Sequence, residues 1–248
     1  MWGRTEKTPK KSDLMKRILT VLFFWLLSIC WLIPASAQEQ TAGSLFTIGR
    51  LKYDGGGDWY SDPTSLPNLL EFLQQETGIP AATREAVVEP SDRAIFNYPY
   101  LYMTGHGRIT FSEEDAANLR RHLTSGGFLH VDDNYGLNEH FRREIKKVFP
   151  DRELQEVPFS HPIYHCHFDF PNGPPKIHEH DGKPPQGFGI FDQGRLVVYY
   201  TYESDLGDGW EDPDVHGDPE EVRLQAQKMG VNIIIYALRR YELAGGGK

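Results

Sequence analysis

The chain has 248 residues, of which 35 are acidic and 26 basic, and its formal net charge is −9 at pH 7. Six basic and two acidic residues lie within residues 1–37, so the rest of the chain carries 20 basic and 33 acidic residues and a net charge of −13. Such a surface repels nucleic acid and anionic lipid, which proteins bind chiefly through Lys and Arg. The composition therefore excludes a nucleic-acid-binding role and favours a neutral or cationic small ligand.

Residues 1–37 have the three parts of a secretory signal peptide. A basic stretch ends at Arg17, an apolar run extends from Ile18 to Ile33, and a small-x-small exit ends at Ala37. The apolar run of 16 residues is shorter than the roughly 20 that span a bilayer, which argues against the alternative of a membrane anchor. We expect cleavage after Ala37, export to the periplasm or extracellular space, and no membrane span after processing.

The processed chain has the length of one domain and a single cysteine, Cys166. It can form no internal disulfide, so its stability must come from a hydrophobic core. We expect a polar linker at 38–45, one α/β domain at 46–241 and a Gly-rich flexible tail at 242–248.

Strand and helix patterns alternate along this domain. The pattern predicts strands at 46–53, 100–104 and 128–131, with a helix after each of them; the helix that carries Leu66, Leu69, Leu70 and Leu73 has these leucines at the spacing of one buried stripe. Ser112 is expected to cap the second helix. A hairpin is expected at 187–202, and a long last helix at about 219–241. This order predicts an open parallel sheet with helices on both faces, plus a C-terminal hairpin insertion.

Unusual polar residues follow three of the expected strands. They are the stretch from Asp54 to Asp58, His106, and the pair Asp132 and Asp133. Ligands of open parallel sheets bind beyond the carboxyl ends of the strands, so we expect these loops to share one pocket. The glycine run around Gly56 could bind an anion through backbone N–H groups, or could simply form a tight turn.

Asp132 is our candidate general base, with His106 as its partner. An aspartate between a strand and a helix is also a common N-cap, so we expect one residue of the pair Asp132 and Asp133 to be functional and the other to cap the next helix.

A metal site is expected at His178, His180 and Asp181. In an extended segment the two histidines project from the same face, at a spacing that can bind zinc. Asp132, His106 or Asp181 could supply a third ligand; the alternative is a polar loop with solvated histidines. The segment 203–212 mixes acids with glycines, as calcium loops do, but lacks the EF-hand spacing. The cofactor is therefore unknown, with zinc or calcium as the candidate divalent metals.

Aromatic rings beside acidic residues are typical of sugar-binding sites. Trp59, Tyr60 and Trp210 have such neighbours, although they could equally pack the rim of a loop. The residues expected to contact a ligand are Asp54, Gly56, Asp58, Trp59, Asp133, Glu203, Asp208 and Trp210.

Five blocks of sequence resemble the bacterial domain-of-unknown-function family 4159: LKYDGGGDWYSDPTSLPNLL, NYPYLYMTGHGRITFSEED, LTSGGFLHVDDNYG, PKIHEHDGKPPQGFGIF and YTYESDLGDGWED. The resemblance extends from about Phe46 to Arg239. That family is similar to class I glutamine amidotransferase-like domains, which implies a flavodoxin-like sheet. The stretch 128–133 lacks the nucleophilic cysteine of a Gly-x-Cys-x-Gly turn and Cys166 lies in an unlike context, so an active glutamine amidotransferase is not expected.

We therefore expect an exported domain that binds a carbohydrate-like or other neutral small ligand, and that acts as a metal-assisted hydrolase. In that case His178 and His180 serve as metal ligands or proton-transfer groups. The alternative is a non-catalytic recognition module or a subunit of a cell-envelope assembly. A catalytic site should contain a titratable group with a strongly shifted pKa near a pocket, whereas a pure binding module need not.

Overall fold

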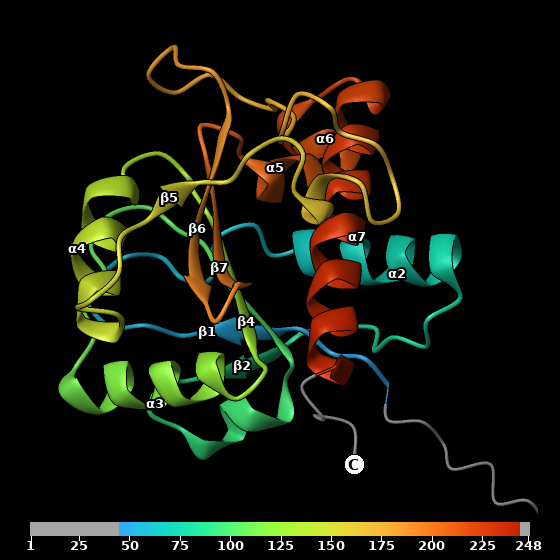
Figure 1. Cartoon of the computed structure of the whole chain (residues 1–248). Helices are drawn as coiled ribbons and strands as arrows, with labels where there is room; N and C mark the ends of the chain where they lie inside the picture. The colour runs from blue at the N-terminus through green and yellow to red at the C-terminus, as the bar shows by residue number, and fades with distance from the viewer. Residues whose placement is uncertain (1–44, 244–248) are drawn as a thin grey trace, which may run out of the picture. The chain divides into compact units, whose positions relative to one another are not determined.

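The computed structural model describes residues 45–243, which form a mixed α/β domain (Figure 1). The expected signal peptide at 1–37, residues 38–44 of the linker and residues 244–248 of the tail lie outside the described residues. Within 45–243, no helix has both the length and the apolar character that crossing a membrane requires.

The described residues contain a seven-stranded sheet with the order β2-β1-β3-β4-β7-β6-β5. Its strands are β1 (Gly49–Leu51), β2 (Ala86–Val88), β3 (Tyr100–Met103), β4 (Phe128–Asp132), β5 (Gln155–Glu156), β6 (Gln186–Asp192) and β7 (Arg195–Tyr202). Strands β2, β1, β3, β4 and β7 run parallel to one another. In contrast, β6 is antiparallel to β7 and β5 is antiparallel to β6. The sheet is therefore mixed: the expected parallel arrangement holds for five strands, and the edge formed by β6 and β5 is antiparallel.

The predicted hairpin is confirmed, and its turn is formed by Gln193 and Gly194, both with positive φ. It is not an insertion, however, because β7 pairs with β4 in register, with Leu129 opposite Val198. The hairpin thus supplies the fifth parallel strand of the sheet and brings the residues that follow Tyr202 to the edge where β4 ends.

Four longer helices flank the sheet: α2 (Ser65–Thr77), α3 (Glu113–Thr124), α4 (Asn138–Val148) and α7 (Glu220–Leu243). The short helices are η1 (Arg93–Asn97), η2 (Pro162–Tyr164), α5 (Leu206–Trp210) and α6 (Pro213–His216). The predicted cap of α3 is confirmed, because Ser112 accepts a hydrogen bond from the N–H of Asp115 and the Asp115 carboxylate accepts one from the N–H of Ser112.

Two hydrophobic cores lie on opposite faces of the sheet. Successive side chains of a strand point to opposite faces, and accordingly Tyr100 and Tyr102 of β3 belong to one core whereas Leu101 and Met103 belong to the other. The first core contains the predicted leucine stripe of α2 and residues of α7; the second contains residues of α3 and α4. Figure 1 shows these helix pairs on the two sides of the sheet. Burial of each leucine contributes about 1.5–3 kcal/mol to the free energy of folding. The helices cover the faces of the sheet, so loops occupy the ends of the strands.

Candidate active site

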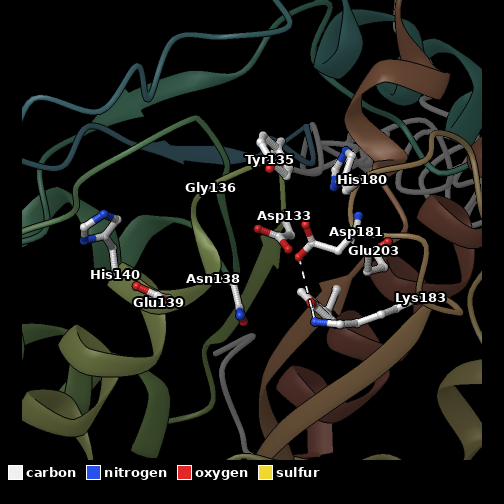
Figure 2. Close-up of a pocket in the computed structure, with 11 residues that line it drawn as sticks. Asp133, Tyr135, Gly136, Asn138, Glu139, His140, His180, Asp181, Lys183 and Glu203 are labelled. Atoms are coloured by element: carbon white, nitrogen blue, oxygen red, sulfur yellow. Dashed lines mark hydrogen bonds and ion pairs between the residues drawn. The ribbon is translucent and has the colours of Figure 1, made fainter.

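A polar pocket lies beyond the carboxyl ends of β4 and β7. Its volume is about 310 Å³. The residues that line it come from three segments, as Figure 2 shows: Asp133, Tyr135, Gly136, Asn138, Glu139 and His140 after β4, His180, Asp181 and Lys183 before β6, and Tyr202 and Glu203 at the end of β7. Four of the predicted site residues, Asp133, His180, Asp181 and Glu203, therefore meet at one pocket.

Asp133 is the buried acid of this pocket. Its residue is only 2 % exposed, and its Oδ1 has no hydrogen-bond partner among the described residues. Burial raises the pKa of Asp133 to about 7, although a hydrogen bond with Tyr200 and the charge of His180 act in the opposite direction. A carboxyl group with a pKa near neutrality can both give and take a proton at pH 7.

Glu203 lines the same pocket but is held in the ionised form. Its carboxylate accepts hydrogen bonds from Lys176 Nζ at 2.7 Å and from the N–H of Asp181 at 2.9 Å. Burial acts to raise the pKa of Glu203, but these hydrogen bonds outweigh it and the pKa is lowered. The pocket thus holds two carboxyl groups whose environments separate their pKa values.

Asp132 is fully buried and does not line the pocket. Its Oδ1 accepts a hydrogen bond from the hydroxyl of Thr201 and its Oδ2 accepts one from the N–H of Gly207 at 2.6 Å. Burial raises its pKa well above the ordinary range. Asp132 therefore joins β4 to β7 and α5, and its expected role as a general base stays a prediction.

Neither aspartate caps the next helix, which corrects the expected division of roles. The cap position of α4 is occupied by Leu137, which makes no side-chain capping bond. The chain instead continues for several residues beyond Asp133 before α4 begins at Asn138.

His106 pairs with Asp58 and not with Asp132. Its Nδ1 lies 3.1 Å from Asp58 Oδ2, and its backbone N–H donates to the other oxygen of the same carboxylate. Burial acts to raise the pKa of Asp58, but the hydrogen bonds from His106 outweigh it and the pKa is lowered. The loops after β1 and β3 therefore meet each other through this pair, in which the His106 side chain is about half exposed, but the residues 54–58 and His106 do not line the pocket at β4 and β7.

The glycine run after β1 packs against the loop after β3. Asp54 is exposed and forms an isolated bridge with Thr110. A Cβ at Gly55, where φ is +118°, would lie 2.7 Å from the carbonyl oxygen of Arg108. Gly56 also has a positive φ, but faces open space. This close approach at Gly55 supports the tight-turn interpretation of the run.

The tryptophans occupy different environments from those expected of sugar-stacking rings. Trp210 is fully buried in the core and donates its indole N–H to the carbonyl oxygen of Ala226, so the expectation that it stacks on a ligand is wrong. Trp59 is half-buried, with its ring 5.5 Å from that of Tyr60 in an edge-on arrangement. The exposed ring in the pocket is Tyr135, which sequence reasoning missed; it is 60 % exposed and lies 5.5 Å from the ring of His180.

The two predicted metal-binding histidines share one carboxylate. Oδ2 of Asp205 lies 3.3 Å from Nδ1 of His178 and 3.0 Å from Nε2 of His180. The hydrogen bond with Asp205 raises the pKa of both histidines, to about 9 for His178. The alternating spacing did predict that these rings lie on the same side.

Asp181 does not join these histidines. It is exposed, and its carboxylate lies 3.8 Å from Lys183 Nζ at the pocket. His178 instead lies close to Asp208 and His216, and the possible ligand atoms of the three residues are all within 4.8 Å of one another. His216 was missed in the sequence because it lies 38 positions after His178, on a separate short helix, α6.

A further buried acid, Asp62, is hydrogen-bonded to the segment that follows Asp133. Its carboxylate accepts hydrogen bonds from Asn134 at 3.1 and 3.2 Å. Burial, and to a smaller extent the charge of Asp208, raises the pKa of Asp62 to about 7. Burial, and to a smaller extent the charge of Asp205, raises the pKa of Asp208 to about 7. Such a concentration of shifted carboxyl groups is typical of functional sites.

The fold and the site define a mixed α/β domain with a titratable pocket at the carboxyl edge of its sheet. A family model described as "Domain of unknown function (DUF4159)" matches residues 47–238, and the chain belongs to this family. The matched region includes all the residues that line the pocket. A search of curated proteins gave no match.

Proposed function

We propose that this is an exported domain that binds a carbohydrate-like small molecule in the pocket at the ends of β4 and β7, and that Asp133 transfers protons to or from it. The observation that carries the proposal is the free Oδ1 of Asp133, a carboxyl group with a pKa of about 7 in a pocket of about 310 Å³. A volume of this size lies at the lower end of the range for small-molecule sites.

The lining of the pocket favours a ligand rich in hydroxyl groups. Asp133 offers a carboxyl group, Lys183 offers a donor, and Tyr135 offers an exposed ring. A neutral sugar can use both kinds of hydrogen-bonding group and can place its apolar face on the ring. The surrounding acidic residues would repel an anionic ligand.

The separation of the two pKa values supports a hydrolase. Asp133 keeps its proton up to about pH 7, whereas Glu203 is ionised. Pairs of carboxyl groups with separated pKa values divide the acid role from the charge-stabilising role in known hydrolases. We assign Asp133 as the acid that protonates the leaving oxygen, or the base that activates water. Glu203, whose side chain is only 1 % exposed, would contribute negative charge to the pocket without contacting the ligand.

We also place the domain in the glutamine amidotransferase-like superfamily, without amidotransferase activity. The parallel strands have the order β2-β1-β3-β4-β7, which corresponds to the 2-1-3-4-5 order of flavodoxin-like sheets. Cys166 donates its thiol to the carbonyl oxygen of Asn232, and burial raises its pKa to about 11. Such a thiol is a poor nucleophile.

A panel of soluble oligosaccharides, followed by saturation-transfer NMR, tests the binding. We expect at least one glycan to bind the wild-type protein and to lose binding in Tyr135→Ala. Tyr60→Ala is the matched control, because Tyr60 is similarly exposed, at 63 %, on the loop after β1. Asp133→Asn should retain binding and release no product.

Two results would contradict the proposal. Loss of binding in Tyr60→Ala but not in Tyr135→Ala would place the ligand at the loop after β1. An absence of signal across the whole panel would favour the recognition module or envelope-assembly subunit.

A further inference from the structure

His178, Asp208 and His216 form a cluster beside the pocket, and their possible ligand atoms all lie within 4.8 Å of one another. Nδ1 of His178 lies 2.8 Å from Asp208 Oδ2, and Nε2 of His216 lies 3.6 Å from Asp208 Oδ1. Ligands bound to zinc at about 2.0–2.2 Å stand roughly 3.3–3.6 Å apart on a tetrahedron. Shifts of about 1 Å or less in these side chains would therefore bring their ligand atoms to coordination distances.

Acidic partners hold the outer side of the cluster. Asp218 lies 3.1 Å from Nε2 of His178, on the side of the ring opposite Nδ1. Histidines that bind a metal usually donate their other ring N–H to a carboxylate in this way, which fixes the ring and its tautomer. Glu211 Oε2 lies 3.3 Å from Nε2 of His216 and contacts that ring from outside the cluster.

Asp205 provides an independent observation that points to a cation at this cluster. Its residue is only 4 % exposed, and its Oδ2 lies 3.3 Å from the same Nδ1 of His178. Its Oδ1 has no hydrogen-bond partner among the described residues. A buried carboxylate oxygen without a partner costs free energy, so its position beside two histidines and Asp208 favours a bound positive ion.

We propose that His178, Asp208 and His216 bind one divalent transition-metal ion, with Asp218 as the residue that positions His178. Zinc fits best, because two of the three ligands are imidazole nitrogens. Calcium takes six to eight oxygen ligands and does not fit this set. The site replaces the expected trio of His178, His180 and Asp181, and it does not depend on the proposed sugar ligand.

The metal site lies next to the ligand pocket. Asp205 Oδ2 contacts His178 Nδ1 and also, at 3.0 Å, Nε2 of His180, which lines the pocket. A metal bound at Nδ1 of His178 would take the place of the hydrogen bond from this nitrogen to Asp205, and would so change the contact between Asp205 and His180.

Isothermal titration calorimetry of the purified, EDTA-treated protein with zinc chloride tests the proposal. We expect one equivalent of zinc to bind, with a rise in melting temperature, and the same concentration of calcium to give no heat. His216→Ala and His178→Ala should weaken zinc binding by roughly tenfold or more, and Asp218→Asn by about 10–100-fold. His165→Ala is the matched control, because His165 is a partly exposed histidine paired with Asp169, outside the cluster.

Circular dichroism before metal addition shows whether each variant is folded, and His216→Ala is the decisive variant because its side chain is 30 % exposed. Wild-type protein that binds no zinc would overturn the proposal and leave the cluster as a salt-bridge network only. Zinc binding of equal strength in His216→Ala and in the His165→Ala control would overturn it as well. Neither result depends on glycan binding, so the two proposals can fail separately.

Discussion

Nδ1 of His178 lies 2.8 Å from Oδ2 of Asp208, although 30 positions separate the two residues. The contact joins the loop before β6 to α5, which follows β7. The segments that enter and leave the β6–β7 hairpin are therefore in contact at the carboxyl edge of the sheet. The pocket and the proposed metal cluster are thereby neighbours that separate substitutions can probe.

Replacement of Asp133 by Asn should stabilise the protein at neutral and alkaline pH. The folded state raises the pKa of Asp133 from 3.8 to about 7, so it binds this proton more tightly than the unfolded chain does. The wild-type protein therefore loses stability as the pH rises from about 4 to about 7, and the loss is complete above the folded-state pKa.

Urea unfolding at pH 4.5 and pH 8 measures this effect. The free energy of unfolding of Asp133→Asn, relative to wild type, should be higher at pH 8 than at pH 4.5 by roughly 2–4 kcal/mol. Asp54→Asn, at an exposed aspartate, is the control. A difference independent of pH would show that burial does not shift this group.

Replacement of Gly207 by Ala should destabilise the protein, because α5 packs closely against buried polar side chains at this position. A Cβ at this position would lie 2.7 Å from Asp62 Oδ2 and 2.8 Å from the hydroxyl of Tyr102. Because Asp132 also accepts the N–H of Gly207, the helix cannot move away without losing that hydrogen bond. We expect urea unfolding to show a free energy of unfolding about 1–3 kcal/mol lower than that of the wild-type protein. A variant as stable as the wild type would mean that α5 moves to accommodate the added methyl group without cost.

Replacement of Trp210 by Phe should cost stability without affecting ligand binding. The change removes the hydrogen bond to Ala226 and leaves a cavity in the core, which together cost roughly 2–4 kcal/mol. Trp59→Phe, at a half-buried ring, should cost less than about 1 kcal/mol. Chemical denaturation of both variants measures whether Trp210→Phe loses more stability than Trp59→Phe. If Trp210→Phe lost glycan binding but kept its stability, the Trp210 ring would contact the ligand and this prediction would be wrong.

The processed protein should begin at Gln38. Export machinery cleaves after a small-x-small exit such as the one that ends at Ala37. N-terminal sequencing of protein recovered outside the cytoplasm measures the cleavage site. A chain that retains Met1 would favour the membrane-anchor alternative.

Local sequence patterns predicted the elements that have enough length to show a period. The stripe from Leu66 to Leu73 is fully buried in α2, and the capping box at Ser112 forms as expected. The strands β2 and β5 have only three and two residues, so neither could show an alternation, and both were missed.

The sequence by itself determined the family, the alternation of helices and strands, and the edge of the sheet where the polar loops meet, because these depend on short-range periodicity and on the direction of the strands. Only the tertiary structure decided which of two adjacent acids, Asp132 or Asp133, lines the pocket, that Trp210 lies in the core, and that His216 joins His178. Burial and ligand geometry are set by contacts between segments many residues apart, and no local pattern in the chain encodes them.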